Sequence, residues 1–178
     1  MRDFIQTSRA SIDKNDLELL FNLLGDFHPK NILEIGTWKG FSAEVWIRGF
    51  APENFITIEI EKEKIKEYDV NSRPGYQSWY DCDSHDTDTY DIVKIYLPEI
   101  DFLFIDGDHS YDGVVTDWKL YSPLVKKGGV VVFHDVVYTS PDPLAPVEVR
   151  QFWQEIRGKY TWVEIHSTNS TGMGVLWV

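Results

Sequence analysis

The sequence is poor in cysteine and in basic residues. Its 178 residues include one cysteine, Cys82, so the chain cannot form an internal disulfide or a zinc site built from cysteines. Lysine and arginine number 17 against 29 aspartate and glutamate residues, which gives a formal net charge of −12. A charge of this sign opposes non-specific binding to nucleic acid and to anionic lipid surfaces. We therefore expect no nucleic-acid partner and no membrane partner.

Long apolar runs are also missing from the sequence. The first residues, Met1 to Phe4, lack the apolar core of a signal peptide, and no run approaches the roughly eighteen residues of a membrane span. No repeat or low-complexity linker divides the chain, whose length is typical of one domain. We expect a cytoplasmic protein with a single domain over residues 1–178.

Apolar strands alternate with amphipathic helices along the sequence. Strands are expected at residues 31–36, 55–60, 76–80, 101–106, 130–133, 160–166 and 174–178. Helices are expected at residues 17–24, 41–48, 61–68, 88–97, 111–121 and 149–156. Ser11 or Asp13 is the expected cap of the first helix, and Pro123 or a turn at Gly128-Gly129 is expected to stop the fifth. The pattern predicts an α/β fold: a doubly wound, mostly parallel, Rossmann-like sheet with an antiparallel hairpin at its C-terminal edge.

In open sheets of this kind, ligands bind outside the carboxyl ends of the strands. After the first expected strand, Gly36 permits a sharp turn close to a ligand, and Gly40 permits close contact between helix and strand. Glycine is also common in ordinary turns between strands and helices. A dinucleotide-binding fingerprint, G-x-G-x-x-G, needs a glycine where this sequence has Trp38, which argues against NAD.

Glu59 ends the second expected strand, about twenty residues after the glycine turn. An acid at this place accepts hydrogen bonds from ribose hydroxyls in nucleotide-binding sheets. The alternative is a solvent-exposed acid beside Glu61 and Glu63. In combination with the glycine turn, the ribose-binding interpretation is favoured.

Residues 32–135 resemble the class I S-adenosylmethionine (SAM)-dependent methyltransferases. The family's first motif, which holds the methionine part of the cofactor, is similar to Glu34-x-Gly36-x-x-x-Gly40-x-Ser42. Glu59 matches the family's ribose-binding acid, and the run from Asp83 to His85 falls where a loop after the third strand contacts adenine. The resemblance implies cofactor contacts from Glu34, Gly36, Thr37, Trp38, Gly40, Ser42, Glu59, Ile60, Asp83, Ser84 and Asp106.

A second stretch makes the resemblance more specific. The stretch consists of the run FIDGDHSY at residues 104–111, followed by Gly128-Gly129 and Phe133-His134-Asp135. It resembles one small branch of the family, near the macrocin O-methyltransferase and cephalosporin-hydroxylase-like proteins. Related catechol-type O-methyltransferases often hold a magnesium ion between the fourth and fifth strands, which implies possible Mg²⁺ ligands at Asp106, His134 and Asp135. The metal-free alternative makes Asp106 an N-cap or a contact for the methionine ammonium group, and makes Asp135 a loop-capping acid.

His109 lies three residues after Asp106, where catechol-type relatives place a basic residue that acts on the substrate hydroxyl. A histidine that titrates near neutral pH suits a general base. The resemblance thus implies catalytic roles for His109 and Asp106. The alternative is a loop histidine bonded to Asp108.

The resemblance implies a SAM-dependent methyltransferase, and the favoured reaction is O-methylation of a small hydroxylated molecule. The alternatives are a non-catalytic cofactor-binding module and, with less support, an NAD-dependent oxidoreductase. Catechol-type enzymes build the substrate site from extra N-terminal helices, whereas 30 residues precede Asn31 here. The substrate pocket is therefore expected to be small, open or completed by a partner chain in a homo-oligomer. The rings of Trp38, Trp79 and Trp118 could stack on adenine or line a pocket, but packing in the core is the favoured interpretation.

Overall fold

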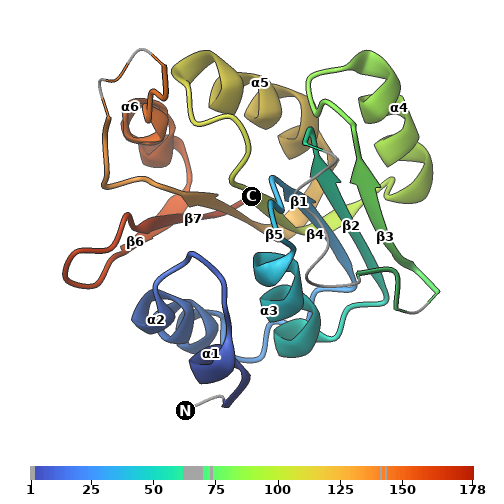
Figure 1. The fold of residues 1–178 in the computed structure, drawn as a ribbon, viewed down its shortest axis with the longest axis horizontal. Coiled ribbons are helices and arrows are strands. Elements are labelled where there is room, and N and C mark those ends of the chain that lie inside the picture. The colour runs from blue at the N-terminus through green and yellow to red at the C-terminus, as the bar shows by residue number, and fades with distance from the viewer. Residues whose placement is uncertain (1–2, 62–69, 73, 141, 143) are drawn as a thin grey trace.

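A computed structural model of the chain describes residues 3–61, 70–72, 74–140, 142 and 144–178. Its strands form one sheet in the order β3-β2-β1-β4-β5-β7-β6. The strands are β1 (Asn31–Ile35), β2 (Asn54–Glu59), β3 (Tyr76–Tyr80), β4 (Ile100–Ile105), β5 (Val125–His134), β6 (Thr161–Ile165) and β7 (Met173–Trp177). The first five pair in parallel, and β7 runs antiparallel to both β5 and β6 (Figure 1). The predicted α/β class and the antiparallel edge hairpin are confirmed.

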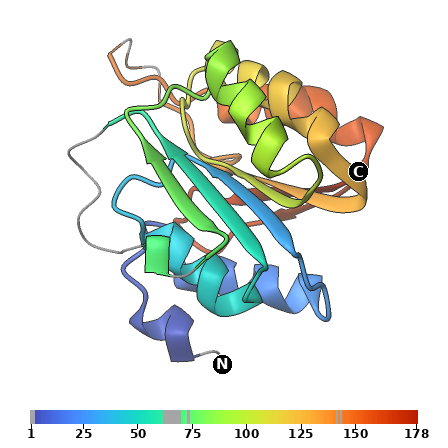
Figure 2. The ribbon, with the colours of Figure 1, turned by 90° about the vertical axis from the view of Figure 1, so that its right-hand side faces the viewer.

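Helices cover both faces of this sheet. The α-helices of the described residues are α1 (Asp3–Thr7), α2 (Lys14–Leu24), α3 (Phe41–Phe50), α4 (Thr87–Tyr96), α5 (Tyr111–Tyr121) and α6 (Val149–Ile156). Single 3-10 turns lie at Val70–Ser72, Ser122–Leu124 and Arg157–Lys159. The first three α-helices lie on one face and the last three on the other (Figure 1 and Figure 2). The short helix α1 was not expected, because five residues carry little periodicity.

The central strands are buried on both faces. Every residue of β4 is buried, with Phe102 and Phe104 packing against Trp46 of α3, while Leu103 and Ile105 face the side of α5 and α6. Burial on both faces explains why this strand is a continuous apolar run. The packed layers fix the carboxyl end of β4 next to that of β1, with which it pairs.

The ends of two helices settle the alternatives left by the sequence. Asp13 caps α2, since its carboxylate accepts hydrogen bonds from two backbone N–H groups of the first turn, and Gly25 ends the helix. Pro123 lies in the 3-10 turn directly after α5. The expected turn at Gly128-Gly129 is wrong: this pair lies within β5, in a bulge that shifts the register between β4 and β5. Gly128 adopts a φ of 80° in this bulge, a conformation that favours glycine.

The helix expected at residues 61–68 falls, apart from its first residue, outside the described residues. Within the described part of the chain, no helix is long and apolar enough to cross a membrane.

Candidate active site

A cavity of about 720 Å³ opens at the carboxyl ends of the parallel strands. Residues that follow β1, β2, β3, β4 and β5 all line it. The chain reverses the direction of strand addition between β1 and β4, and open α/β sheets bind ligands at such a switch point. The sequence-based expectation that strand ends carry the site therefore agrees with the position of the cavity.

The glycine turn after β1 is shaped by the neighbouring strand end. Gly36 has a φ of 84°, and a Cβ atom at this position would lie 2.1 Å from the carbonyl oxygen of Asp106 and 2.8 Å from the Cα of Gly107. No side chain fits in that space. The turns after β1 and β4 therefore pack against each other directly, a requirement for glycine that is independent of any ligand.

Glu59 holds the same turn from the end of β2. Its Oε2 accepts a hydrogen bond from the backbone N–H of Trp38 at 2.7 Å, and its Oε1 accepts one from the N–H of Glu61 at 2.9 Å. The side chain is nearly buried, so the alternative of a solvent-exposed acid is wrong. Glu59 lines the cavity and also orders the loop around it.

The ring of Trp38 does not lie in the core. The residue is 45% exposed, lines the cavity and has the Lys39 ammonium 4.7 Å from its ring centroid. Its backbone adopts a φ of 47°, in the left-handed region that is uncommon for residues other than glycine. The expectation of core packing is wrong for Trp38, whereas Trp79 and Trp118 are partly buried against the core.

The residues expected to contact the cofactor separate into two groups. The cavity is lined by Gly36, Thr37, Trp38, Ser42, Glu59, Ile60, Asp83, Ser84 and Asp106. Gly40, with a φ of 79°, forms the N-terminal cap of α3 and does not line it. Glu34 is also absent from the lining, because its buried carboxylate accepts hydrogen bonds from Trp46 Nε1 at 3.0 Å and Thr57 Oγ1 at 2.7 Å. Burial raises the pKa of Glu34 to about 7.

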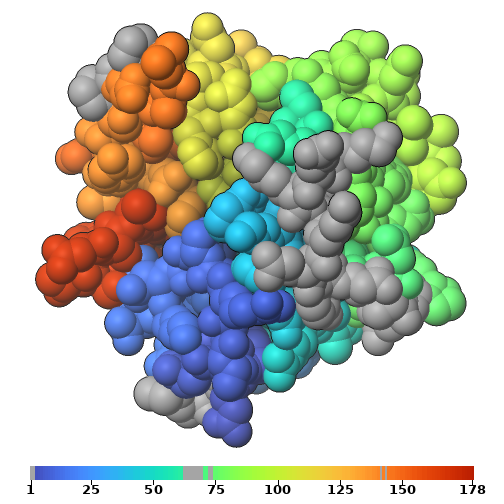
Figure 3. Space-filling model, in the orientation of Figure 1, coloured from blue at the N-terminus to red at the C-terminus, as the bar shows by residue number. Residues whose placement is uncertain are grey.

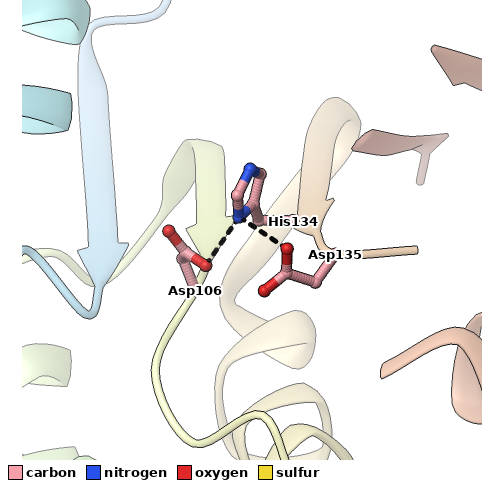
Figure 4. Close-up of side chains that lie close together, drawn as sticks. All are labelled: Asp106, His134 and Asp135. Atoms are coloured by element: carbon pink, nitrogen blue, oxygen red, sulfur yellow. Dashed lines mark hydrogen bonds and ion pairs between the residues drawn. The ribbon is translucent and has the colours of Figure 1, made fainter. Parts of the chain in front are cut away.

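A cluster of acids and imidazoles lies at the ends of β4 and β5. His134 Nδ1 lies 3.1 Å from Asp106 Oδ1 and 3.3 Å from Asp135 Oδ1 (Figure 4). His109 Nε2 lies 3.2 Å from the same Asp106 oxygen, and His109 Nδ1 lies 3.6 Å from Asp135 Oδ2. The side chains expected to converge at this edge do converge. Asp106, His134 and Asp135 each offer one ligand atom within 4.8 Å of the others, as a shared metal site requires.

Two sequence-based alternatives for this cluster are wrong. His109 contacts Asp106, whereas the Asp108 carboxylate accepts the N–H of Ser110. Asp106 is not the cap of α5 either, because the Ser110 hydroxyl accepts the N–H of Gly113 there.

The charges of the cluster depend on one another. Burial alone would raise the pKa of Asp106, but the positive charge of His134 and a hydrogen bond from His109 hold it at about 2. Burial alone would lower the pKa of His134, but Asp106 and Asp135 raise it to about 10. The hydrogen bond to Asp106 also raises the pKa of His109. The protonated imidazole of His134 thus offsets the repulsion between the two carboxylates.

Two lining residues, Ser11 and Thr171, were not singled out as site residues by the sequence. Thr171 Oγ1 lies 3.2 Å from His134 Nε2. The loops that carry them are tied together, since the Ser167 hydroxyl donates to Asp13 Oδ1 at 2.8 Å and the Ser167 N–H donates to Asp16 Oδ1. Figure 3 shows the hairpin, in red, beside the N-terminal helices, in blue. No spacing in the sequence relates segments this far apart.

Sequence comparison gives two matches. The family model described as a methyltransferase domain matches residues 33–136. The uncharacterized protein R132 of Acanthamoeba polyphaga mimivirus is 31% identical over 156 residues, which cover 80% of this chain and 69% of that protein.

Solved structures share the fold at low sequence identity. A Staphylococcus aureus protein assigned as a caffeoyl-CoA O-methyltransferase matches with a TM-score of 0.73 and 20% identity, covering 98% of this chain and 88% of that one. The O-methyltransferase TomG of Streptomyces achromogenes, solved with SAM, matches with a TM-score of 0.67 and 23% identity, and the match covers 94% of this chain and 81% of TomG. The mycinamycin-pathway methyltransferase MycE, solved with Mg, SAH and mycinamycin VI, matches with a TM-score of 0.63 and 16% identity, and the match covers 92% of this chain and 48% of MycE.

Proposed function

This chain belongs to the methyltransferase domain family, and from that premise we propose that it transfers the methyl group of SAM to a hydroxyl oxygen of a small molecule. One observation carries the proposal: a single cavity joins two chemically different ends. The cofactor end consists of Gly36, Trp38, Glu59 and Ser84. The acceptor end consists of Asp106, His109, His134, Asp135 and Thr171.

The cofactor end fits SAM. A cavity of about 720 Å³ lies within the usual size of small-molecule sites. Each oxygen of Glu59 accepts one backbone hydrogen bond, and a carboxylate oxygen has a further lone pair for a ribose hydroxyl. The carboxylates of Glu59 and Asp83, which line this end, suit a cationic ligand. When bound, SAM supplies a methyl group activated by its sulfonium charge.

The acceptor end fits the removal of a hydroxyl proton. Methyl transfer to oxygen leaves the acceptor hydroxyl with a proton to lose, and a positioned histidine can accept it. The His109 side chain is 36% exposed and lines the cavity, and Asp106 fixes its Nε2. We assign His109 as the base, in its neutral form, and Asp106 as the carboxylate that orients it. A module that only binds a cofactor has no need of this cluster.

Asp106, His134 and Asp135 also fit a divalent cation. Carboxylate oxygens suit Mg²⁺ and Mn²⁺, and one imidazole is compatible with such a set. A cation would take the place of the proton on His134, because only a neutral imidazole ligates a metal. When bound, the cation would lower the pKa of a coordinated hydroxyl.

Titration calorimetry with SAM, S-adenosylhomocysteine, NAD and NADP tests the proposed cofactor. We expect binding of the first two alone, and preferential binding of NAD or NADP would overturn the proposal. Methyl transfer from isotope-labelled SAM to catechols, sugars and other polyols then identifies the acceptor class. A parallel assay after EDTA treatment, with Mn²⁺ or Mg²⁺ added back, tests the cation, and turnover insensitive to the chelator would exclude it.

A further inference from the structure

A buried acid on α5 has no role in the site described so far. Asp117 is fully buried at the middle of this helix, on the side that faces the sheet. A carboxylate in such a place requires compensation for its lost hydration. The partners that the structure provides come from the loop between β3 and α4, which lines the cavity with Asp83, Ser84 and His85.

Helix α5 holds that loop at two points. The Ser84 hydroxyl donates a hydrogen bond to Asp117 Oδ1 at 2.8 Å. His85 Nε2 lies 3.3 Å from the same oxygen, at ion-pair distance but without the geometry of a hydrogen bond. One helical turn later, the Tyr121 hydroxyl donates to the carbonyl oxygen of Ser84 at 2.7 Å. Tyr121 is itself fully buried, so both points of attachment lie on a rigid part of the core.

The other oxygen of the carboxylate faces a different wall of the cavity. Among the described residues, Asp117 Oδ2 has no hydrogen-bond partner. A Cβ atom at Gly107 would lie 3.4 Å from it, so this oxygen adjoins the residue that follows Asp106. Asp117 therefore lies between the loop after β3 and the turn after β4.

We infer that Asp117 is a positioning residue that holds Ser84 and His85 in the wall of the cofactor end without touching the cofactor. The inference rests on the proposed function. Glu59 at the end of β2 places the ribose, and the reacting groups Asp106 and His109 follow β4. The adenine of the cofactor is then directed away from β4, toward the loop after β3, which Asp117 holds.

The charge of His85 reports this arrangement. The contact with Asp117 raises the pKa of His85, against the effect of burial, and the charges of Asp83 and Asp108 act in the same direction. The Asp83 carboxylate lies 4.0 Å from His85 Nδ1. Asp117→Asn keeps an acceptor for the Ser84 hydroxyl and removes the negative charge. The pKa of His85 should therefore fall in this variant.

An NMR titration of the histidine ring protons in the cofactor-free protein tests this step alone. We expect the His85 midpoint to fall in Asp117→Asn and to stay unchanged in Asp112→Asn, a matched change at an exposed position of the same helix. An unchanged midpoint in Asp117→Asn would overturn the inference.

Calorimetry with S-adenosylhomocysteine tests the consequence for the cofactor. We expect Asp117→Asn and His85→Gln each to weaken binding about tenfold, and the double variant to be no weaker than the worse single variant. Additive losses would show that Asp117 acts elsewhere and would overturn the inference. If the unmodified protein fails to bind S-adenosylhomocysteine, the proposed function fails, and the NMR titration still decides whether Asp117 sets the state of His85.

Discussion

The two ends of the cavity are held in place by different kinds of contact. At the cofactor end, Glu59 is fixed by the backbone N–H groups of Trp38 and Glu61, whose positions do not depend on the protonation of a side chain. At the acceptor end, Asp106 and His134 hold each other, and the pKa of each is set by the charge of the other. Substitution of Glu59 should therefore have a local effect. Substitutions at the acceptor end should change the charge of several groups at once.

The largest effect is expected from a change at the acceptor end that leaves the cofactor end intact. His109→Gln removes the proposed base, and loss of a general base typically lowers turnover about 10²-fold or more. Affinity for SAM should stay nearly unchanged, since His109 lies beside Asp106 and Asp135 and not beside Glu59. Initial rates and calorimetry measure the two quantities. His28→Gln, at an exposed loop position, is the control. Full turnover in His109→Gln would remove this residue from the mechanism.

The next effect concerns the stability of the layer beneath the cofactor end. The pKa of Glu34 is raised by burial from 4.5 to about 7, so the folded protein favours the neutral carboxyl. The stability that the protonated Glu34 side chain contributes to the fold is fully present below pH 4.5. It is lost as the pH rises through 7, because the unfolded chain has already released this proton. The free energy of unfolding should fall by about 3 kcal/mol across this window. In Glu34→Gln this decline should disappear, as urea unfolding at a series of pH values will show. Parallel profiles for the two proteins would contradict the assignment.

At the cofactor end itself, Glu59→Ala should weaken SAM binding by about 1.5–3 kcal/mol, the usual cost of losing hydrogen bonds to a charged acceptor. Turnover at saturating SAM should change much less, because the acceptor end keeps its own contacts. Calorimetry and steady-state kinetics separate these effects. A loss of turnover at saturating SAM that equals the loss in His109→Gln would show that the two ends are not independent.

The elements of the cofactor end could largely be predicted from the sequence. The periodicity and the apolar runs place the strands, and parallel pairing brings the carboxyl ends of neighbouring strands to one edge. The sequence alone therefore places Glu59 and Asp106 at this edge. The sequence does not show why residue 36 must be glycine. The atom that excludes a side chain there is the carbonyl oxygen of Asp106, 70 residues away in the sequence. The variant Gly36→Val is therefore expected to disrupt folding, so it cannot test how closely the cofactor approaches this turn.

The acceptor end was predicted less completely. Its acids and histidines follow β4 and β5 and could be named from the sequence, but their charges could not, because the pKa of His134 depends on two carboxylates at distances only the fold determines. Thr171 and the fully buried Asp117 had no sequence signal either. Each is defined by a contact between segments far apart in the chain, which periodicity does not encode.

The smallest effect is expected where these distant segments meet. Ser167→Ala removes the hydroxyl bond to Asp13 and leaves the backbone N–H bond to Asp16 in place. One such bond contributes about 1 kcal/mol, so the free energy of unfolding should fall by about that amount. Because Thr171 belongs to the same hairpin loop and lies 3.2 Å from His134 Nε2, KM for the acceptor should rise while SAM affinity stays unchanged. Thr168→Ala, at an exposed position of this loop, is the matched control. A rise in the SAM dissociation constant without a rise in the acceptor KM would place this loop at the cofactor end and contradict the division proposed here.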